Sequence, residues 1–168
     1  MLTSHELLGF MSPPLALDIL TYAYETDKPL YRATLGAVAD ARKLRPVFLE
    51  RQPRPQRHAT MLTTLARPAL DLVASNLLRV WLLKKHRQML ADFLDALGIP
   101  HQDGVVDELP SAMEEAKVRA AVAVLLAKHP PEVVAVYLHA FSEMNTVGWP
   151  SLKPMLETDP RLQLGGAS

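Results

Sequence analysis

Apolar residues recur along the chain at the three- and four-residue spacing of α-helices, and the alternation typical of strands hardly occurs. This pattern predicts an all-α protein, a single-domain bundle of about seven helices. The expected helices cover about 6–11, 13–25, 28–44, 60–97 with a kink or a new start at Pro68, 112–128, 132–144 and 151–157.

The stretch 69–83 is the most apolar part of the chain, with eleven apolar residues among fifteen. Its apolar residues do not keep to one face, and Asp71, Ser75 and Arg79 leave only a thin polar strip. A helix that is apolar nearly all round is enclosed by protein or spans a membrane. We therefore expect an almost fully buried central helix at about 69–83, which continues in phase to 97, with a break at 84–88 as the alternative.

Two further segments, 118–127 and 133–141, are also apolar over most of their helical circumference. A single core of this size encloses one such helix comfortably, and three of them suggest that a second chain covers part of the apolar surface. The sequence therefore predicts a homodimer formed through apolar helices. The alternative is that the alanines of 118–127 need no further cover.

Proline and glycine mark the expected element boundaries. Pro13 after Ser12 indicates a helix start, and Gly98 before Pro100 indicates a helix end. Asp27 is expected to cap the next helix, and Asp103 with Gly104 indicates a tight turn. The segment 45–58 contains three prolines and is expected to be an exposed Pro/Arg-rich loop, with room for a single helical turn at 47–51 and an extended course over 52–57. The last residues, 164–168, are expected to be a frayed tail.

The length of 168 residues fits one domain covering 1–168. The absence of cysteine excludes disulfides and suits a reducing compartment. No secretory signal is recognisable, and no window of about 20 residues is free of charge, so a membrane span is not expected. These features predict a cytoplasmic protein without a membrane association.

The net charge is zero but is distributed unevenly. Residues 42–87 contain eleven basic and two acidic residues, whereas residues 88–116 contain seven acidic residues and no lysine or arginine. Two interpretations stay open. The two blocks pair with each other, within or between chains, or the basic block faces an anionic partner.

Arg51, Arg54 and Arg57 recur at every third residue around two prolines. In a polyproline-like segment with three residues per turn, this spacing puts the three guanidinium groups on one side, where they can bind phosphates or carboxylates. The candidate anion- or partner-binding residues are Arg51, Arg54, Arg57, Lys84, Lys85 and Arg87. Nucleic acid is a possible but not a favoured partner, because aromatic residues for base stacking are few.

Catalytic and metal-binding signals are weak. His139 and Glu143 lie one helical turn apart, and a small-ligand pocket, if one exists, would involve His139, Glu143 and His86. No metal site and no cofactor are expected, and no glycine-rich phosphate loop or serine elbow occurs. The leading hypothesis is a non-enzymatic interaction or regulatory protein. The alternative is an anion- or nucleic-acid-binding protein that uses 42–57 and 84–87 on a phosphate backbone. A small-ligand binder or an enzyme is the least favoured interpretation.

Overall fold

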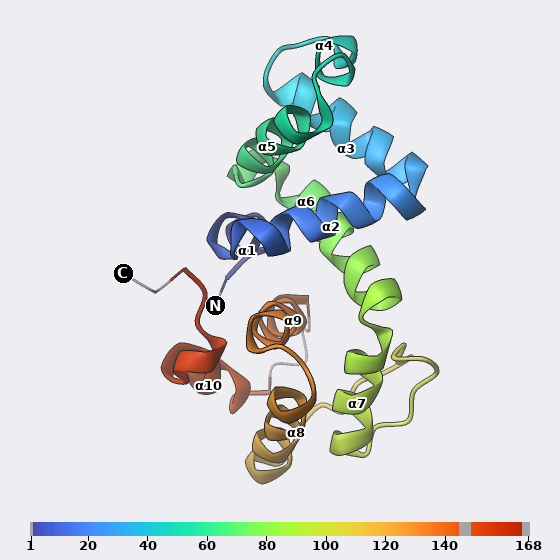
Figure 1. Cartoon of the computed structure of the whole chain (residues 1–168). Helices are drawn as coiled ribbons and strands as arrows, with labels where there is room; N and C mark the ends of the chain where they lie inside the picture. Colours follow the sequence, from blue (N-terminus) through green and yellow to red (C-terminus); the bar gives the residue numbers. More distant parts are fainter. Residues whose placement is uncertain (1, 145–148, 166–168) are drawn as a thin grey trace. The chain divides into compact units, whose positions relative to one another are not determined.

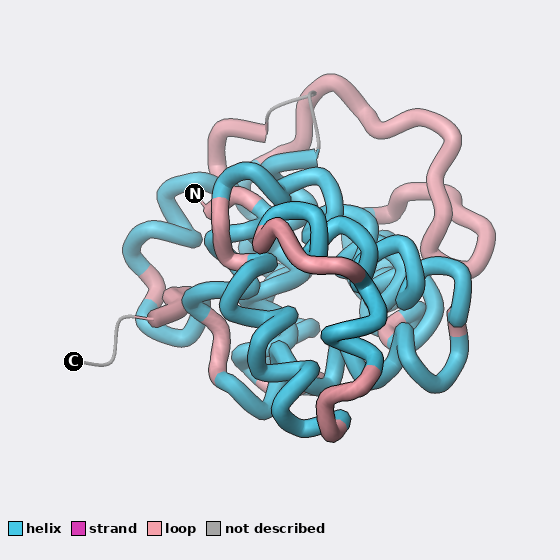
Figure 2. The backbone as a smooth tube through the Cα atoms, turned by 90° about the horizontal axis from the view of Figure 1, so that it is seen from above, coloured by secondary structure: helices cyan, strands magenta, loops and turns pink. Residues whose placement is uncertain are grey.

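The structure is a computed structural model that describes residues 2–144 and 149–165, and over these residues it is all-α (Figures 1 and 2). The predicted fold class is confirmed, although the described residues form ten α-helices where about seven were expected. The helices are α1 (Ser4–Phe10), α2 (Pro13–Thr26), α3 (Lys28–Ala41), α4 (Pro46–Glu50), α5 (Arg54–Leu65), α6 (Asp71–Val80), α7 (Arg87–Leu97), α8 (Glu115–Lys128), α9 (Pro131–Met144) and α10 (Leu152–Thr158). Single 3-10 turns form at Pro68–Leu70 and Pro160–Leu162, and a π-helical turn at Trp81–Lys85. No described helix has the length and apolar character needed to cross a bilayer.

The chain divides into two compact units. The N-terminal unit is Thr3–Trp81, with α1 to α6, and the C-terminal unit is Leu82–Ser168 together with Met1–Leu2, with α7 to α10. The expected helix through 69–97 is interrupted by the π-helical turn that contains this boundary, so it is not one continuous helix. That the chain is a single domain stays a prediction.

Several helix ends lie where local signals predict them. Pro13 is the first residue of α2, and the side chain of Asp27 accepts a hydrogen bond from the main-chain N–H of Leu30 at 3.1 Å, which caps α3. Gly98 ends α7 in the left-handed conformation, with φ of +73°. These ends follow from the backbone preferences of single residues, which operate whatever the tertiary fold.

The N-terminal unit packs α1, α2, α3 and α5 around α6 (Figure 1). Trp81, at the end of α6, is buried, and its indole N–H donates to a carboxylate oxygen of Asp18 on α2 at 3.0 Å. The expectation that α6 is enclosed on all sides is wrong, because Leu72 is 74% exposed and Asn76 and Arg79 are also exposed. These three residues lie on one face of the helix, at positions i, i+4 and i+7, and that face meets solvent.

Within the segment 45–58, the allowed single turn forms as α4, but residues 52–57 do not form the predicted extended segment. Pro46 begins α4, and Pro53 and Pro55 lie at the N-cap and in the first turn of α5. Proline is tolerated there because the first N–H groups of a helix have no partner within the helix. The prolines thus start two helices instead of excluding them.

In the C-terminal unit, α9 is the helix that is enclosed on all sides. Its residues from Val133 to Ala140 are all buried, and α9 packs against α8, α10 and the turn Pro160–Leu162. The single chain therefore covers the apolar surface of α9 without a second copy. By contrast, α8 buries only one face, which includes Val118 and Leu125.

A long loop joins α7 to α8, the large pink loop in Figure 2. Asp103 and Gly104 have φ of +52° and +84° and form the predicted tight turn, in which Gln102 and Val105 exchange two main-chain hydrogen bonds. Of the predicted frayed tail, 164–165 form a bend and 166–168 lie outside the described residues.

Candidate functional site

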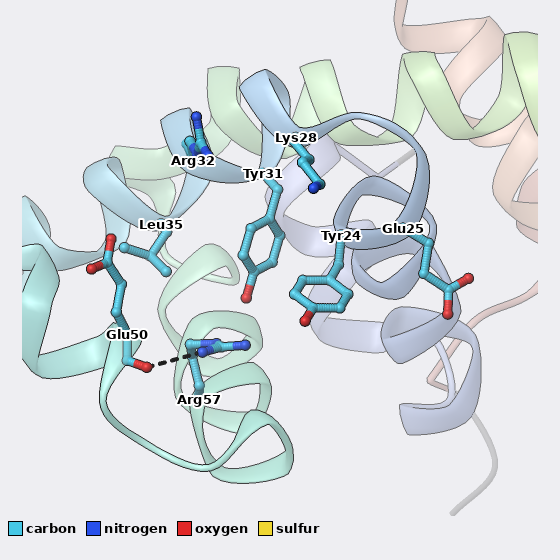
Figure 3. Close-up of a pocket in the computed structure, with 8 residues that line it drawn as sticks. All are labelled: Tyr24, Glu25, Lys28, Tyr31, Arg32, Leu35, Glu50 and Arg57. Atoms are coloured by element: carbon cyan, nitrogen blue, oxygen red, sulfur yellow. Dashed lines mark hydrogen bonds between the residues drawn. The ribbon is translucent and has the colours of Figure 1, made fainter.

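A groove with a volume of about 530 Å³ opens on the N-terminal unit, where α2, α3, α4 and α5 meet (Figure 3). Its lining combines two tyrosines and a leucine with three cations and two carboxylates. The lining residues are Tyr24, Glu25, Lys28, Tyr31, Arg32, Leu35, Glu50 and Arg57. Figure 3 shows the hydroxyl groups of Tyr24 and Tyr31 directed toward the guanidinium group of Arg57, whereas Glu25 points away from it.

The position of Arg57 follows from the local helix. Because α5 begins at Arg54, Arg54 and Arg57 are three residues apart in its first turns and share a face. The Arg54 guanidinium lies 5.1 Å from the centre of the Tyr24 ring, and that of Arg57 lies 5.8 Å from Tyr24 and 5.9 Å from Tyr31. Both cations are therefore held against the electron-rich faces of tyrosine rings.

Below these cations, Tyr24, Tyr31 and His58 form an aromatic cluster. The ring centres of the two tyrosines are 5.0 Å apart in an edge-to-face arrangement, and His58 lies 5.7 Å and 5.6 Å from them. The hydroxyl of Tyr31 and Nε2 of His58 share a hydrogen bond of 2.9 Å. This cluster fixes the tyrosine rings that form one side of the groove.

The imidazole of His58 is 2% exposed. Burial, together with the charges of Arg57 and Arg54, lowers the pKa of His58 to about 4. His58 is therefore neutral at physiological pH. Burial also raises the pKa of Tyr31, against the opposing effect of Arg57, so the phenol keeps its proton as well. The positive charge at the groove thus comes from the arginines and Lys28 alone.

The cations of the groove are not neutralised by the carboxylates beside them. Within the N-terminal unit as described, Lys28, Arg32 and Arg57 form no ion pair. Nη1 of Arg57 donates to the main-chain oxygen of Glu50 at 3.2 Å, and Nε of Arg57 is buried without a hydrogen-bond partner. A buried N–H donor without a partner is costly unless a ligand or water meets it. The groove therefore offers charge and hydrogen-bond donors to an anion.

The six predicted anion- or partner-binding residues fall in different places. Arg54 and Arg57 flank the groove as just described, and Arg51 is an exposed residue at the end of α4. The three arginines therefore do not form the expected row of exposed side chains on an extended segment. Lys84, Lys85 and Arg87 belong to the C-terminal unit, in the π-helical turn and at the start of α7.

His139, predicted as a possible pocket residue, has a structural role. It is buried on α9, its Nε2–H donates to the main-chain oxygen of Leu162 at 3.1 Å, and its Nδ1 accepts from the N–H of Leu2 at 3.4 Å. Both ring nitrogens are thus occupied by the main chain. Glu143 lies one turn further along α9, and His86 precedes α7.

Three other histidines pair with aspartates, at distances of 2.6–2.8 Å: His5 with Asp71, His101 with Asp95 and His129 with Asp92. The hydroxyl of Thr3 approaches the same Nδ1 of His5 that binds Asp71, at 3.1 Å. A catalytic triad needs the hydroxyl on the opposite nitrogen, so this arrangement lacks the relay geometry. Among the described residues, no group of three or more potential ligands could hold a metal ion.

Sequence reasoning missed Tyr24, Tyr31 and Lys28. The available signal was the spacing of Tyr24 and Tyr31 on either side of the short connection at Asp27, which brings two consecutive helices together as a hairpin. Comparisons with protein-family models, with curated proteins and with solved structures found no match for this chain.

Proposed function

We propose that the protein is a non-enzymatic binding protein and that its N-terminal unit holds a small organic anion in the tyrosine–arginine groove. The observation that carries this proposal is the Arg57 guanidinium, which lies against Tyr24 and Tyr31 with a buried, unpaired Nε and no carboxylate partner. The broader interaction or regulatory role expected from the sequence stays a prediction.

The start of α5 supports an anionic ligand. Arg54 is the first residue of α5, and its guanidinium lies 5.1 Å from the ring centre of the lining residue Tyr24, so the groove lies near this helix N-terminus. A helix N-terminus carries a partial positive charge that favours anions. The N-terminus of α3 adds less, because the carboxylate of Asp27 already accepts a hydrogen bond from one of its N–H groups.

The shape of the groove favours an anion that carries an apolar body. Tyr24, Tyr31 and Leu35 offer ring faces and an aliphatic surface, while the planar guanidinium of Arg57 can bind a carboxylate or a phosphate with two parallel hydrogen bonds. We infer a ligand class of aryl or alkyl carboxylates and phosphate monoesters.

Calorimetric titration of the full chain with phenyl phosphate tests the proposal, with inorganic phosphate and phenol as comparison ligands. We expect phenyl phosphate to bind more tightly than either. Lys28→Gln and Arg57→Lys are each expected to weaken binding by about tenfold, because each removes an ionic or bidentate contact. Arg51→Gln is the matched control, since Arg51 is exposed outside the groove lining.

Equal binding of phenyl phosphate by the wild type, Lys28→Gln and Arg57→Lys would contradict the proposal. Binding of phenol as tight as that of phenyl phosphate would show that the groove selects apolar rings and not anions. Because Lys28 is exposed, its replacement leaves the fold intact even if the Arg57 variant is destabilised.

A further inference from the structure

A second surface of the N-terminal unit combines exposed apolar side chains with cations. Leu44, Val47 and Phe48 are 40%, 38% and 53% exposed, at the junction of α3 and α4, and Leu49 is buried and anchors α4. Exposed cations alternate with them along the chain. We call this surface the basic–apolar corner, and its residues are Lys43, Leu44, Arg45, Val47, Phe48 and Arg51.

The cations of the basic–apolar corner are not neutralised by acidic residues of the N-terminal unit. Glu50 is the one acidic residue of the sequence between Asp40 and Asp71. Within the described N-terminal unit, Lys43, Arg45 and Arg51 form no ion pair. Three large exposed apolar side chains, interspersed along the chain with cations that form no ion pair in this unit, are typical of an interaction site and not of an ordinary solvated surface. The surface therefore fits an acidic partner that also carries an apolar side chain.

The C-terminal unit presents such a surface in the loop that joins α7 to α8. Asp103, Asp107 and Glu108 are exposed there and form no ion pair within the described part of this unit, and Val105 is 55% exposed between them. The other acidic residues of the block are partly engaged, because Asp92 and Asp95 bind His129 and His101. We call Asp103, Val105, Asp107 and Glu108 the acidic loop.

The acidic loop is held in place by its own contacts. Nε2 of His101 and a carboxylate oxygen of Asp95 are 2.6 Å apart, and the N–H of Gly104 donates to Nδ1 of His101 at 3.1 Å. At the other end of the loop, the indole N–H of Trp149 donates to the main-chain oxygen of Pro110 at 3.0 Å. A preorganised loop loses less conformational entropy when it docks.

We propose that the basic–apolar corner of one copy of the chain binds the acidic loop of a second copy. Both surfaces are exposed on the single chain, their charges are opposite in sign, and each carries unburied apolar side chains. In a two-fold dimer, each corner receives the partner's loop, so the contact forms twice. This contact is separate from the anion groove and uses different residues.

Variants with reversed charges test the inference. The association of the full chain is measured by sedimentation velocity at about 50 mM salt. The corner variant is Arg45→Glu with Arg51→Glu, and the loop variant is Asp107→Lys with Glu108→Lys. We expect the wild type to form dimers and the dissociation constant of each variant alone to rise by at least about tenfold, because like charges then face each other twice.

An equimolar mixture of the two variants is the decisive sample. In a mixed dimer, the reversed corner meets the reversed loop and the unchanged corner meets the unchanged loop, so we expect association to return to the wild-type strength. Arg67→Glu with Arg79→Glu is the matched control, with the same change of charge at exposed positions outside the corner. Circular dichroism checks that all variants fold.

A wild-type protein that stays monomeric across micromolar concentrations overturns the inference. A mixture that fails to associate also overturns it, since the corner would then bind another surface. If the control variant weakened the dimer as much as the corner variant does, the net charge of the protein would explain the loss of association. That result would also overturn the inference. Binding of phenyl phosphate in the groove does not depend on any of these outcomes.

Discussion

Helices α6 and α9 look alike in the sequence but are buried very differently. Both are apolar over most of their circumference, yet α9 is buried at every position from Val133 to Ala140. In α6, Leu77 and Leu78 are buried, while Leu72 is 74% exposed. The sequence predicts full enclosure for the segment that contains α6, whereas in the structure α9 is the enclosed helix.

The position of polar residues accounts for the difference better than their number. Asn76 and Arg79 lie on the same face of α6 as Leu72, so solvating them also exposes the leucine. In α9, His139 is the polar residue within the buried run, and the main chain satisfies both of its nitrogens. A buried polar group is tolerated when its hydrogen bonds are complete.

The largest effect on stability is expected when a leucine of α9 is replaced, and a leucine of α6 provides the comparison. Leu138→Ala in α9 should lower the free energy of unfolding by about 2–5 kcal/mol, because it removes a fully buried side chain and leaves a cavity. Leu72→Ala in α6 should change it by less than about 0.5 kcal/mol, because the side chain is mostly exposed. Urea denaturation followed by circular dichroism measures both, and equal losses would contradict the contrast.

The comparison extends to the buried imidazoles of the two units. Burial lowers the pKa of His139 on α9, and the pKa of His58 on α5 is lowered to about 4. As the pH falls below 6.5, both histidines bind protons more readily in the unfolded chain than in the folded one, so stability falls, and for His58 this loss continues down to about pH 4. His58 alone should account for a loss of about 2–3 kcal/mol.

Unfolding of the wild type and of His58→Gln at several pH values between 7 and 4 measures this contribution. Glutamine keeps a hydrogen-bonding group for Tyr31 but does not titrate, so its stability should fall less steeply with decreasing pH. Parallel profiles for the two proteins would show that His58 does not remain neutral in the folded state.

Sequence patterns predicted well those features that depend on neighbouring residues alone. The all-α class, the helix start at Pro13, the cap at Asp27 and the turn at Asp103 and Gly104 all follow from local backbone preferences. The same reasoning failed at Pro53 and Pro55, because a proline pair suits both an extended segment and the first turn of a helix. Tertiary packing decides between these two conformations.

The candidate groove could be predicted only in part, for the same reason. Arg54 and Arg57 were identified from their charge and spacing, but their partners Tyr24 and Tyr31 lie about 30 residues away and meet them through the packing of α2 and α3 on α5. Likewise, burial of α9 in preference to α6 depends on which helices surround each one. The spacing of apolar residues predicts which face of a helix is buried, but it does not predict which other helices cover that face.

The smallest effect on stability is expected when the exposed polar residues of α6 are replaced by leucine, so that α6 becomes as apolar as α9. Asn76→Leu with Arg79→Leu would give α6 an apolar circumference like that of α9. Because both positions are exposed, the added side chains bury little surface, and the free energy of unfolding should change by less than about 0.5 kcal/mol. Urea denaturation at low protein concentration measures the change, and sedimentation velocity shows whether the new apolar face causes association. A gain of about 2 kcal/mol or more in a monomeric variant would mean that this face is enclosed in solution, and the contrast with α9 would then fail.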